Sequence, residues 1–201
     1  MNKNWLAVMA LGVVGGFAAT AVADHDHGGG GQQRVFRAKL SSFNEVPSVS
    51  TPAEGQFYAV ANQEGTAFTY WLSYSGLAFD VSQSHIHFGQ HHVNGGISVW
   101  LCQGTVRAPA SVAAQTPECA LRATTTPITG TIDATDVIGP AGQGIAANEF
   151  AELLAAIRGR AAYANVHSGA AANPGNPTAT PPVPATPAVG FPGGEIRGQV
   201  N

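Results

Sequence analysis

Four of the seven histidines in this sequence fall within eight residues, at His85, His87, His91 and His92. The first two are two positions apart in a predicted strand, so both side chains project from the same face. Their Cα atoms are then about 6.6 Å apart, which lets two imidazoles meet at one ion with the nitrogen distances of about 2.0–2.1 Å typical of zinc. The pattern predicts a transition-metal site that holds copper or zinc.

Three other histidines are candidates for the remaining ligand. His91 or His92 lies just past the predicted strand and can fold back toward it, and His167 ends a second predicted strand. The alternative is structural. In that interpretation His85 and His87 are hydrogen-bonded side chains that anchor a loop, while His91 and His92 are merely solvated.

Short alternating segments must position these histidines. Eight segments are predicted to be strands, at 35–40, 55–61, 68–75, 81–88, 97–101, 127–132, 162–167 and 195–200. In the first and third of them, apolar and polar residues alternate with the period of a half-buried strand. One helix is predicted over 148–158, with Asn148 as its N-cap and Gly159 at its end. We therefore expect a mainly β fold, an antiparallel Greek-key-like sandwich or barrel of about seven to nine strands with one short helix inserted late.

The amino terminus has the layout of a signal peptide over residues 1–23. Lys3 precedes an uncharged apolar run, which ends at Ala21-Val22-Ala23, a pattern that signal peptidase accepts. The alternative is an uncleaved membrane anchor, since the run is near the lower length limit for a span. No second run of this length follows, so no membrane span is expected after cleavage, and the protein is expected to be secreted or periplasmic.

The remaining chain is predicted to hold a leader and one domain. Residues 24–34 form a His- and Gly-rich leader that binds a divalent metal loosely or is a solvated tail, and residues 35–201 form the domain. Within the domain, 170–192 is a Pro-rich segment expected to be an extended surface loop. Charged residues make up only 10% of the chain and no basic patch is present, so a nucleic-acid partner is not expected.

The chain has two cysteines, Cys102 and Cys119, 17 positions apart. In an oxidising compartment such a pair most simply forms a disulfide. The alternative is a pair of metal-binding thiolates, which export and the wide spacing disfavour.

Four segments together resemble a known family. They are L-S-S-F-N-E-V-P at 40–47, S-H-I-H-F-G at 84–89, Y-A-N-V-H-S at 163–168 and G-G-E-I-R-G-Q-V at 193–200. In this order they resemble the chordin-type CHRD domain over residues 35–201. The resemblance implies a β-sandwich domain with no settled enzymatic activity. The link between the third and fourth segments is enlarged here by the Pro-rich stretch.

The motif residues of this resemblance are Asn44, Glu45, Pro47, Asn165, Glu195 and Arg197. Asn44 and Pro47 are interpreted as turn formers. Glu195 and Arg197 are two apart on a predicted strand, so a structural pair is expected there. No catalytic residue is assigned, because the sequence shows neither a serine in a nucleophile-elbow pattern nor an obvious pair of carboxylates.

A looser resemblance concerns the histidines. The segment His85-Ile86-His87 with Gly89 is similar to the H-V-H-x-x-G segment of copper/zinc superoxide dismutases, in which the two histidines bind copper and a late histidine completes the site. The matching positions here are His85, His87 and His167. The bridging histidine, the zinc-binding His and Asp set and the channel arginine of that family are not recognisable. The resemblance therefore supports metal binding and not dismutase activity.

Two functions follow as hypotheses. The first is an exported, non-catalytic domain that binds an unknown protein or a cell-envelope partner. The alternative is a copper- or zinc-binding protein centred on His85 and His87, which stores or buffers the metal or uses copper in redox chemistry, as a superoxide dismutase does.

Overall fold

A computed structural model of the chain describes residues 33–170 and 189–201. The predicted signal peptide at 1–23, the leader up to residue 32 and the Pro-rich residues 171–188 lie outside the described residues.

Eight strands form one sheet. They are β1 (Val35–Ser41), β2 (Glu54–Ala61), β3 (Ala67–Ser75), β4 (Val81–Phe88), β5 (Gly96–Gln103), β6 (Ile128–Asp133), β7 (Ala162–Ala170) and β8 (Val189–Gln199). The order in the sheet is β5-β4-β7-β8-β1-β2-β3-β6, and neighbouring strands pair antiparallel. The predicted mainly β, antiparallel fold is therefore confirmed.

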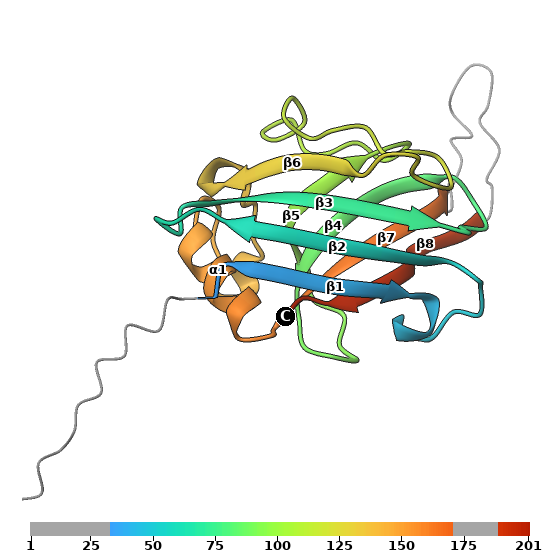
Figure 1. The fold of residues 1–201 in the computed structure, drawn as a ribbon, viewed down its shortest axis with the longest axis horizontal. Coiled ribbons are helices and arrows are strands. Elements are labelled where there is room, and N and C mark those ends of the chain that lie inside the picture. Colours follow the sequence, from blue (N-terminus) through green and yellow to red (C-terminus); the bar gives the residue numbers. More distant parts are fainter. Residues whose placement is uncertain (1–32, 171–188) are drawn as a thin grey trace, which may run out of the picture. The chain divides into compact units, whose positions relative to one another are not determined.

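The sheet folds into two layers at the junction of β1 and β8. These strands pair only at Ser41 and Arg197, whereas β1 pairs with β2 along its whole length. Figure 1 shows the layer β6-β3-β2-β1 in front of the layer β5-β4-β7-β8, with the strands of the two layers crossing at an angle. The core between them is built from alternate residues, such as Phe36 and Leu72 in front and Ile86 and Val166 behind.

The late helix forms as α1 (Phe150–Arg158) and buries an apolar stripe, which consists of Phe150, Leu153, Leu154 and Ile157. The predicted N-cap is wrong. Asn148 has a φ of 69°, so it makes the turn before the helix, and Glu149 occupies the cap position. Gly159 ends the helix as expected. No helix in the described parts of the chain is long and apolar enough to cross a membrane.

The last two strands are longer than the sequence predicts. Beyond a register shift near Val166, Ser168 pairs with Phe191 and Gly169 with Gly190, so the two strands form a ribbon beyond the shift. The ends of the segment 170–192, expected to be a surface loop, are therefore strand.

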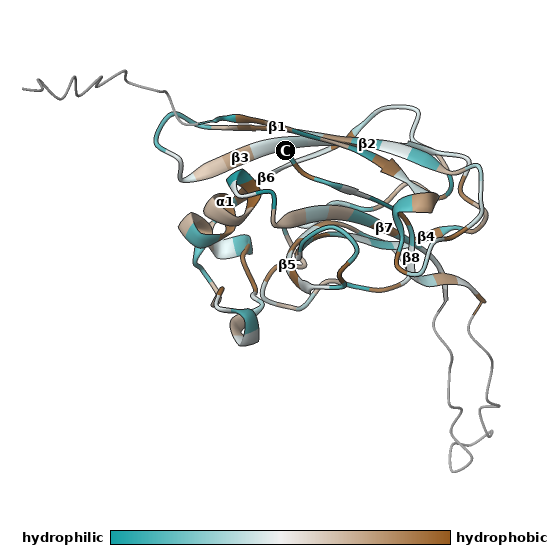
Figure 2. Cartoon of the chain, turned by 90° about the horizontal axis from the view of Figure 1, so that it is seen from below, coloured by the Kyte–Doolittle hydropathy of each residue, from teal (hydrophilic) through white to brown (hydrophobic). Residues whose placement is uncertain are grey.

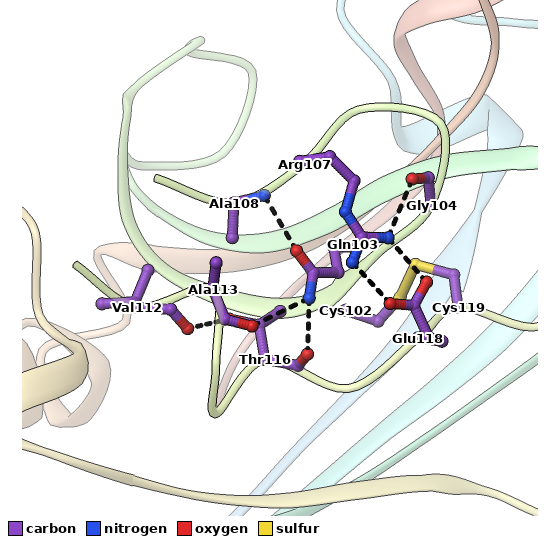
Figure 3. Close-up of polar contacts among 10 residues, drawn as sticks. All are labelled: Cys102, Gln103, Gly104, Arg107, Ala108, Val112, Ala113, Thr116, Glu118 and Cys119. Carbon is purple, nitrogen blue, oxygen red and sulfur yellow. Dashed lines mark hydrogen bonds and ion pairs between the residues drawn. A yellow bond between two sulfur atoms is a disulfide. The ribbon is translucent and has the colours of Figure 1, made fainter. Parts of the chain in front are cut away.

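The Cys102–Cys119 disulfide forms as predicted and closes the loop after β5. Figure 3 shows that this loop is organised around the buried side chain of Gln103. Its amide nitrogen donates to the carbonyls of Ala113 and Thr116 at 2.9 and 2.8 Å, and its amide oxygen accepts from the N–H of Ala108 at 3.1 Å. Ala108 and Val112 of the loop form a small apolar cluster with Trp100 of β5. This second cluster is separate from the main core. Figure 2 shows the two layers from the side, with β1 and β2 in one layer and β4, β7 and β8 in the other.

Candidate metal centre

Three histidines meet on the face of β4 and β7 that is turned away from the core. Ile86 and Val166 point into the core, so their neighbours His85, His87 and His167 project from the opposite face. His85 is 0% exposed, His87 7% and His167 6%. The sequence placed His85 and His87 on one face and left His167 as one of three candidates to join them, and the antiparallel pairing of β4 with β7 brings the three together.

The ring nitrogens of the three histidines have the spacing of metal ligands. One nitrogen of each lies within 4.8 Å of one nitrogen of the other two. His85 Nδ1 and His167 Nε2 are 3.3 Å apart. This distance fits two ligands of one tetrahedral ion, because bonds of about 2.0–2.1 Å at the tetrahedral angle place ligand nitrogens about 3.3–3.4 Å apart.

Backbone carbonyls orient two of the rings. His87 Nδ1 lies 3.0 Å from the carbonyl oxygen of Gly95, and His167 Nδ1 lies 2.9 Å from that of Pro192. A carbonyl only accepts, so each Nδ1 carries the proton and each Nε2 keeps its lone pair. Metal-binding histidines have this arrangement, in which the nitrogen that does not bind the metal donates to a fixed acceptor.

Burial keeps all three rings neutral at pH 7. It lowers the pKa of His87 and of His167 from 6.5 to about 4, and the pKa of His85 well below 6.5. A proton on one ring would also repel a proton on its neighbour, which lowers the pKa of His85 and His87 further. Neutral imidazole is the form that binds a metal ion, so an ion can bind to this cluster without displacing protons from imidazolium groups.

Trp100 closes one side of the cluster. Its ring stands edge-on to the ring of His85, with 4.2 Å between centroids and 86° between planes. The disulfide-closed loop packs on the indole through Ala108 and Val112. No local pattern in the sequence indicates this role, because it depends on a loop contact formed only in the folded chain.

The structure does not bring His91 and His92 to the cluster. Both are exposed in the turn between β4 and β5, and their rings are 5.7 Å apart, centroid to centroid. The chain turns outward after Gly89 and reaches a φ of 62° at His92, so neither ring folds back. The structure therefore places His167 beside His85 and His87, and neither His91 nor His92.

A family model of the CHRD domain matches residues 36–175. The chain belongs to the CHRD domain family. No curated protein and no solved structure matches the chain. CHRD domains are typically extracellular or periplasmic, and membership supports a non-enzymatic domain.

The CHRD motif residue Arg197 connects β8 to the segments around Asn44 and Asn94, beside the histidines. Its Nε donates to the carbonyl of Asn44 at 2.8 Å, and its Nη1 donates to Oδ1 of Asn94 at 2.9 Å. Asn44 in turn donates from Nδ2 to the carbonyl of Arg197 at 3.1 Å. Asn44 therefore does more than form a turn, whereas Pro47 lies in the bend that follows it.

The predicted pair of Glu195 and Arg197 is wrong. Glu195 instead accepts from the N–H of Ala78 at 2.8 Å and from the hydroxyl of Ser168. The register shift between β7 and β8 lies next to Glu195 and places it beside Ser168. The two charged residues therefore bind different segments of the CHRD domain.

Two further CHRD motif residues, Glu45 and Asn165, carry buried oxygens without a hydrogen-bond partner, Oε1 and Oδ1 respectively. Both side chains flank Gly194, where an added Cβ would lie 2.6 Å from Glu45 Oε1 and 2.7 Å from the Asn165 amide. Burial raises the pKa of Glu45 from 4.5 to about 8, against the opposing charge of Arg197. Glu45 therefore holds a proton at neutral pH.

Proposed function

We propose that this CHRD domain is an exported, non-catalytic binding domain whose ligand is a copper or zinc ion held by His85, His87 and His167. The observation that carries the proposal is the convergence of one ring nitrogen from each histidine within 4.8 Å of the others. Three imidazoles suit both ions.

The structural alternative accounts for only part of the cluster. Hydrogen bonds to the carbonyls of Gly95 and Pro192 fix the rings of His87 and His167, and His85 Nδ1 lies within hydrogen-bond distance of His167 Nε2. They leave Nε2 of His85 and of His87 buried without a partner. An unpaired buried polar atom costs about 1–3 kcal/mol, and an ion ligated by His87 Nε2 together with His85 Nδ1 and His167 Nε2 removes that cost at His87.

Export rests on two supports. Disulfides persist in oxidising compartments, and the Cys102–Cys119 bond closes a loop that packs beside the cluster. The CHRD family is typically extracellular or periplasmic. The signal peptide at 1–23 remains part of this proposal, and mass spectrometry of the protein exported by cells tests it by showing whether Asp24 is the first residue.

Metal binding is tested by equilibrium dialysis of the metal-free protein against copper and zinc. We expect one ion per chain for the wild type and at least hundredfold weaker uptake for His85→Gln/His87→Gln. The matched control is His91→Gln/His92→Gln, which removes two exposed histidines from the adjoining turn and should leave the tight site intact.

The leader histidines need a separate control. His25→Gln/His27→Gln should also retain one tightly bound ion per chain. Equal uptake by the wild type and by His85→Gln/His87→Gln would eliminate the site. Loss of the tightly bound ion from the leader variant alone would show that the leader histidines bind it, and this result would equally contradict the proposal.

A further inference from the structure

The layer β6-β3-β2-β1 presents a second feature, on the face opposite the core. Its strands face the viewer in Figure 1, and no other described element packs over them. Tyr58 of β2 and Trp71 of β3 are opposite each other in the strand register, with 5.5 Å between their ring centroids. Trp71 is 37% exposed, and the guanidinium of Arg37 lies 5.5 Å from the centre of the Tyr58 ring. An aromatic pair therefore stands in the middle of an open sheet face.

Three hollows follow β2 along this face. From the Ala61 end to the Glu54 end their volumes are about 530, 520 and 210 Å³. In that order they are lined by residues that include Trp71 and Thr131, then Tyr58 and Gln56, then Ser73 and Glu54. Eight residues of strand at about 3.4 Å each extend for about 27 Å. The row therefore has the length for an extended chain that makes a contact at each hollow.

Each hollow also contains a cation. Arg34 lines the first, Arg37 and Lys39 line the second, and Lys39 reaches the third. Glu54 is the single carboxylate among these lining residues. The three cations take no part in the two ion pairs of the described residues. In a chain with a net charge of −3, this face gathers three cations against one carboxylate.

We propose that this face binds an acidic polysaccharide chain lying along β2 over Tyr58 and Trp71. The C–H groups of a pyranose ring pack against the indole and phenol rings. Hydroxyls of the sugar pair with side chains such as Gln56 and Thr131, and carboxylates of successive sugar units meet the spaced cations. The proposal is independent of the metal site, which lies on the other layer.

A polysaccharide suits the face better than an acidic peptide does. The backbone of β2 is already paired on both sides, with β1 and with β3. The face therefore offers side chains alone, and an extended peptide laid across it would find no backbone partners for its own N–H and C=O groups. Sugar hydroxyls need only the hydroxyl and amide groups that are present.

Affinity electrophoresis of the full chain in gels that contain alginate, a linear polymer of uronic acids, tests the proposal. We expect alginate to retard the wild type in the presence of EDTA and neutral dextran not to retard it. Trp71→Ala should weaken the retardation at least tenfold. The matched control, Phe43→Ala, removes an aromatic ring that is 68% exposed but lines none of the hollows, and it should behave as the wild type.

A separate variant tests how much the positive charges contribute to alginate binding. Arg37→Gln/Lys39→Gln should weaken retardation and lessen its sensitivity to salt, whereas Arg160→Gln, an exposed cation elsewhere, should not. Thermal unfolding establishes whether each variant folds. If Trp71→Ala does not fold, the double variant decides the question. Absence of retardation by alginate, unchanged retardation of a folded Trp71→Ala, or equal binding of poly-L-glutamate each overturns the proposal, the last in favour of an acidic peptide.

Discussion

The phenol ring of Tyr163 lies parallel to the imidazole of His87, with 4.9 Å between ring centroids and 2° between planes. Gly95 connects the same two side chains. Its N–H donates to the Tyr163 hydroxyl at 3.1 Å, and its carbonyl accepts from His87 Nδ1 at 3.0 Å. The Arg197 guanidinium lies 4.5 Å from the centre of the Tyr163 ring. One stack and two hydrogen bonds therefore fix the direction in which His87 Nε2 points.

Replacing Tyr163 should weaken metal binding without removing a ligand. Tyr163→Phe keeps the stack but loses the acceptor for Gly95, so we expect affinity to fall about tenfold. Tyr163→Leu loses both, and about a hundredfold loss is expected, the upper end for residues that orient metal ligands. Competition with a chromophoric chelator measures both affinities. Tyr58→Phe, on the other layer, is the control, and identical affinities for all three variants would show that the stack does not orient His87.

The metal-free protein should lose stability as the pH falls from about 6.5 to about 4. The folded-state pKa of His87 and His167 is about 4, whereas an unfolded histidine titrates near 6.5. In this window the unfolded chain binds protons that the folded cluster does not, so acid favours unfolding. Each such proton contributes about 1.4 kcal/mol per pH unit.

Urea unfolding at several pH values, with EDTA present, measures this slope. His167→Gln should have a shallower slope between pH 4 and 6.5 than the wild type, because one titrating group is gone. His91→Gln, which removes an exposed ring, should leave the slope unchanged. Parallel slopes for wild type and His167→Gln would contradict the effect of burial on that histidine.

Glu45 should act in the opposite direction. Its folded-state pKa is about 8, and an unfolded glutamic acid titrates near 4.5. Between these values the folded chain holds a proton that the unfolded chain has released, so the stability contributed by Glu45 is complete below pH 4.5 and falls as the pH rises to about 8.

The Glu45→Gln variant removes this titration. It should be more stable than the wild type at pH 8–9, and its advantage should shrink as the pH is lowered toward 4.5. The neutral amide also adds a donor beside the unpartnered Oδ1 of Asn165. The difference in the free energy of unfolding between variant and wild type, measured across this range, cancels the opposing slope of the histidines. A difference that does not change with pH would show that Glu45 is ionised throughout.

The strands could be predicted from the sequence because their pattern is local. Phe36 and Leu40 alternate with charged residues in β1, and burial follows that alternation residue by residue. The error at Asn148 has a local cause as well, because an asparagine before a helix can either cap it or adopt a positive φ, and the sequence does not distinguish the two.

The site could be predicted only in part. The spacing of His85 and His87 places them on one face of a strand, but the arrival of His167 depends on the register of β4 against β7, which joins residues 82 positions apart. The roles of Trp100 and Gly95 depend on loop contacts of the same non-local kind. For the same reason the sequence could not separate His167 from His91 and His92 as third ligand.

Removing the disulfide should destabilise the fold and loosen one side of the histidine cluster. Closing a loop across 17 positions constrains the unfolded chain, and loss of such a crosslink costs about 3 kcal/mol on the chain-entropy model. The same loop carries Val112 and Ala108 onto Trp100, which stands against His85. Cys102→Ala/Cys119→Ala should therefore unfold at lower urea and bind the metal more weakly than the wild type.

The exposed ion pair of the same loop serves as the comparison. Arg107 and Glu118 form a bidentate pair with N–O distances of 2.6 and 2.7 Å, but both side chains are more than half exposed. Exposed pairs contribute little, so Glu118→Gln should leave both the urea midpoint and the metal affinity nearly unchanged. If the cysteine variant matched Glu118→Gln in both measurements, the loop would owe its position to Gln103 and its hydrogen bonds, and the disulfide would contribute nothing to the site.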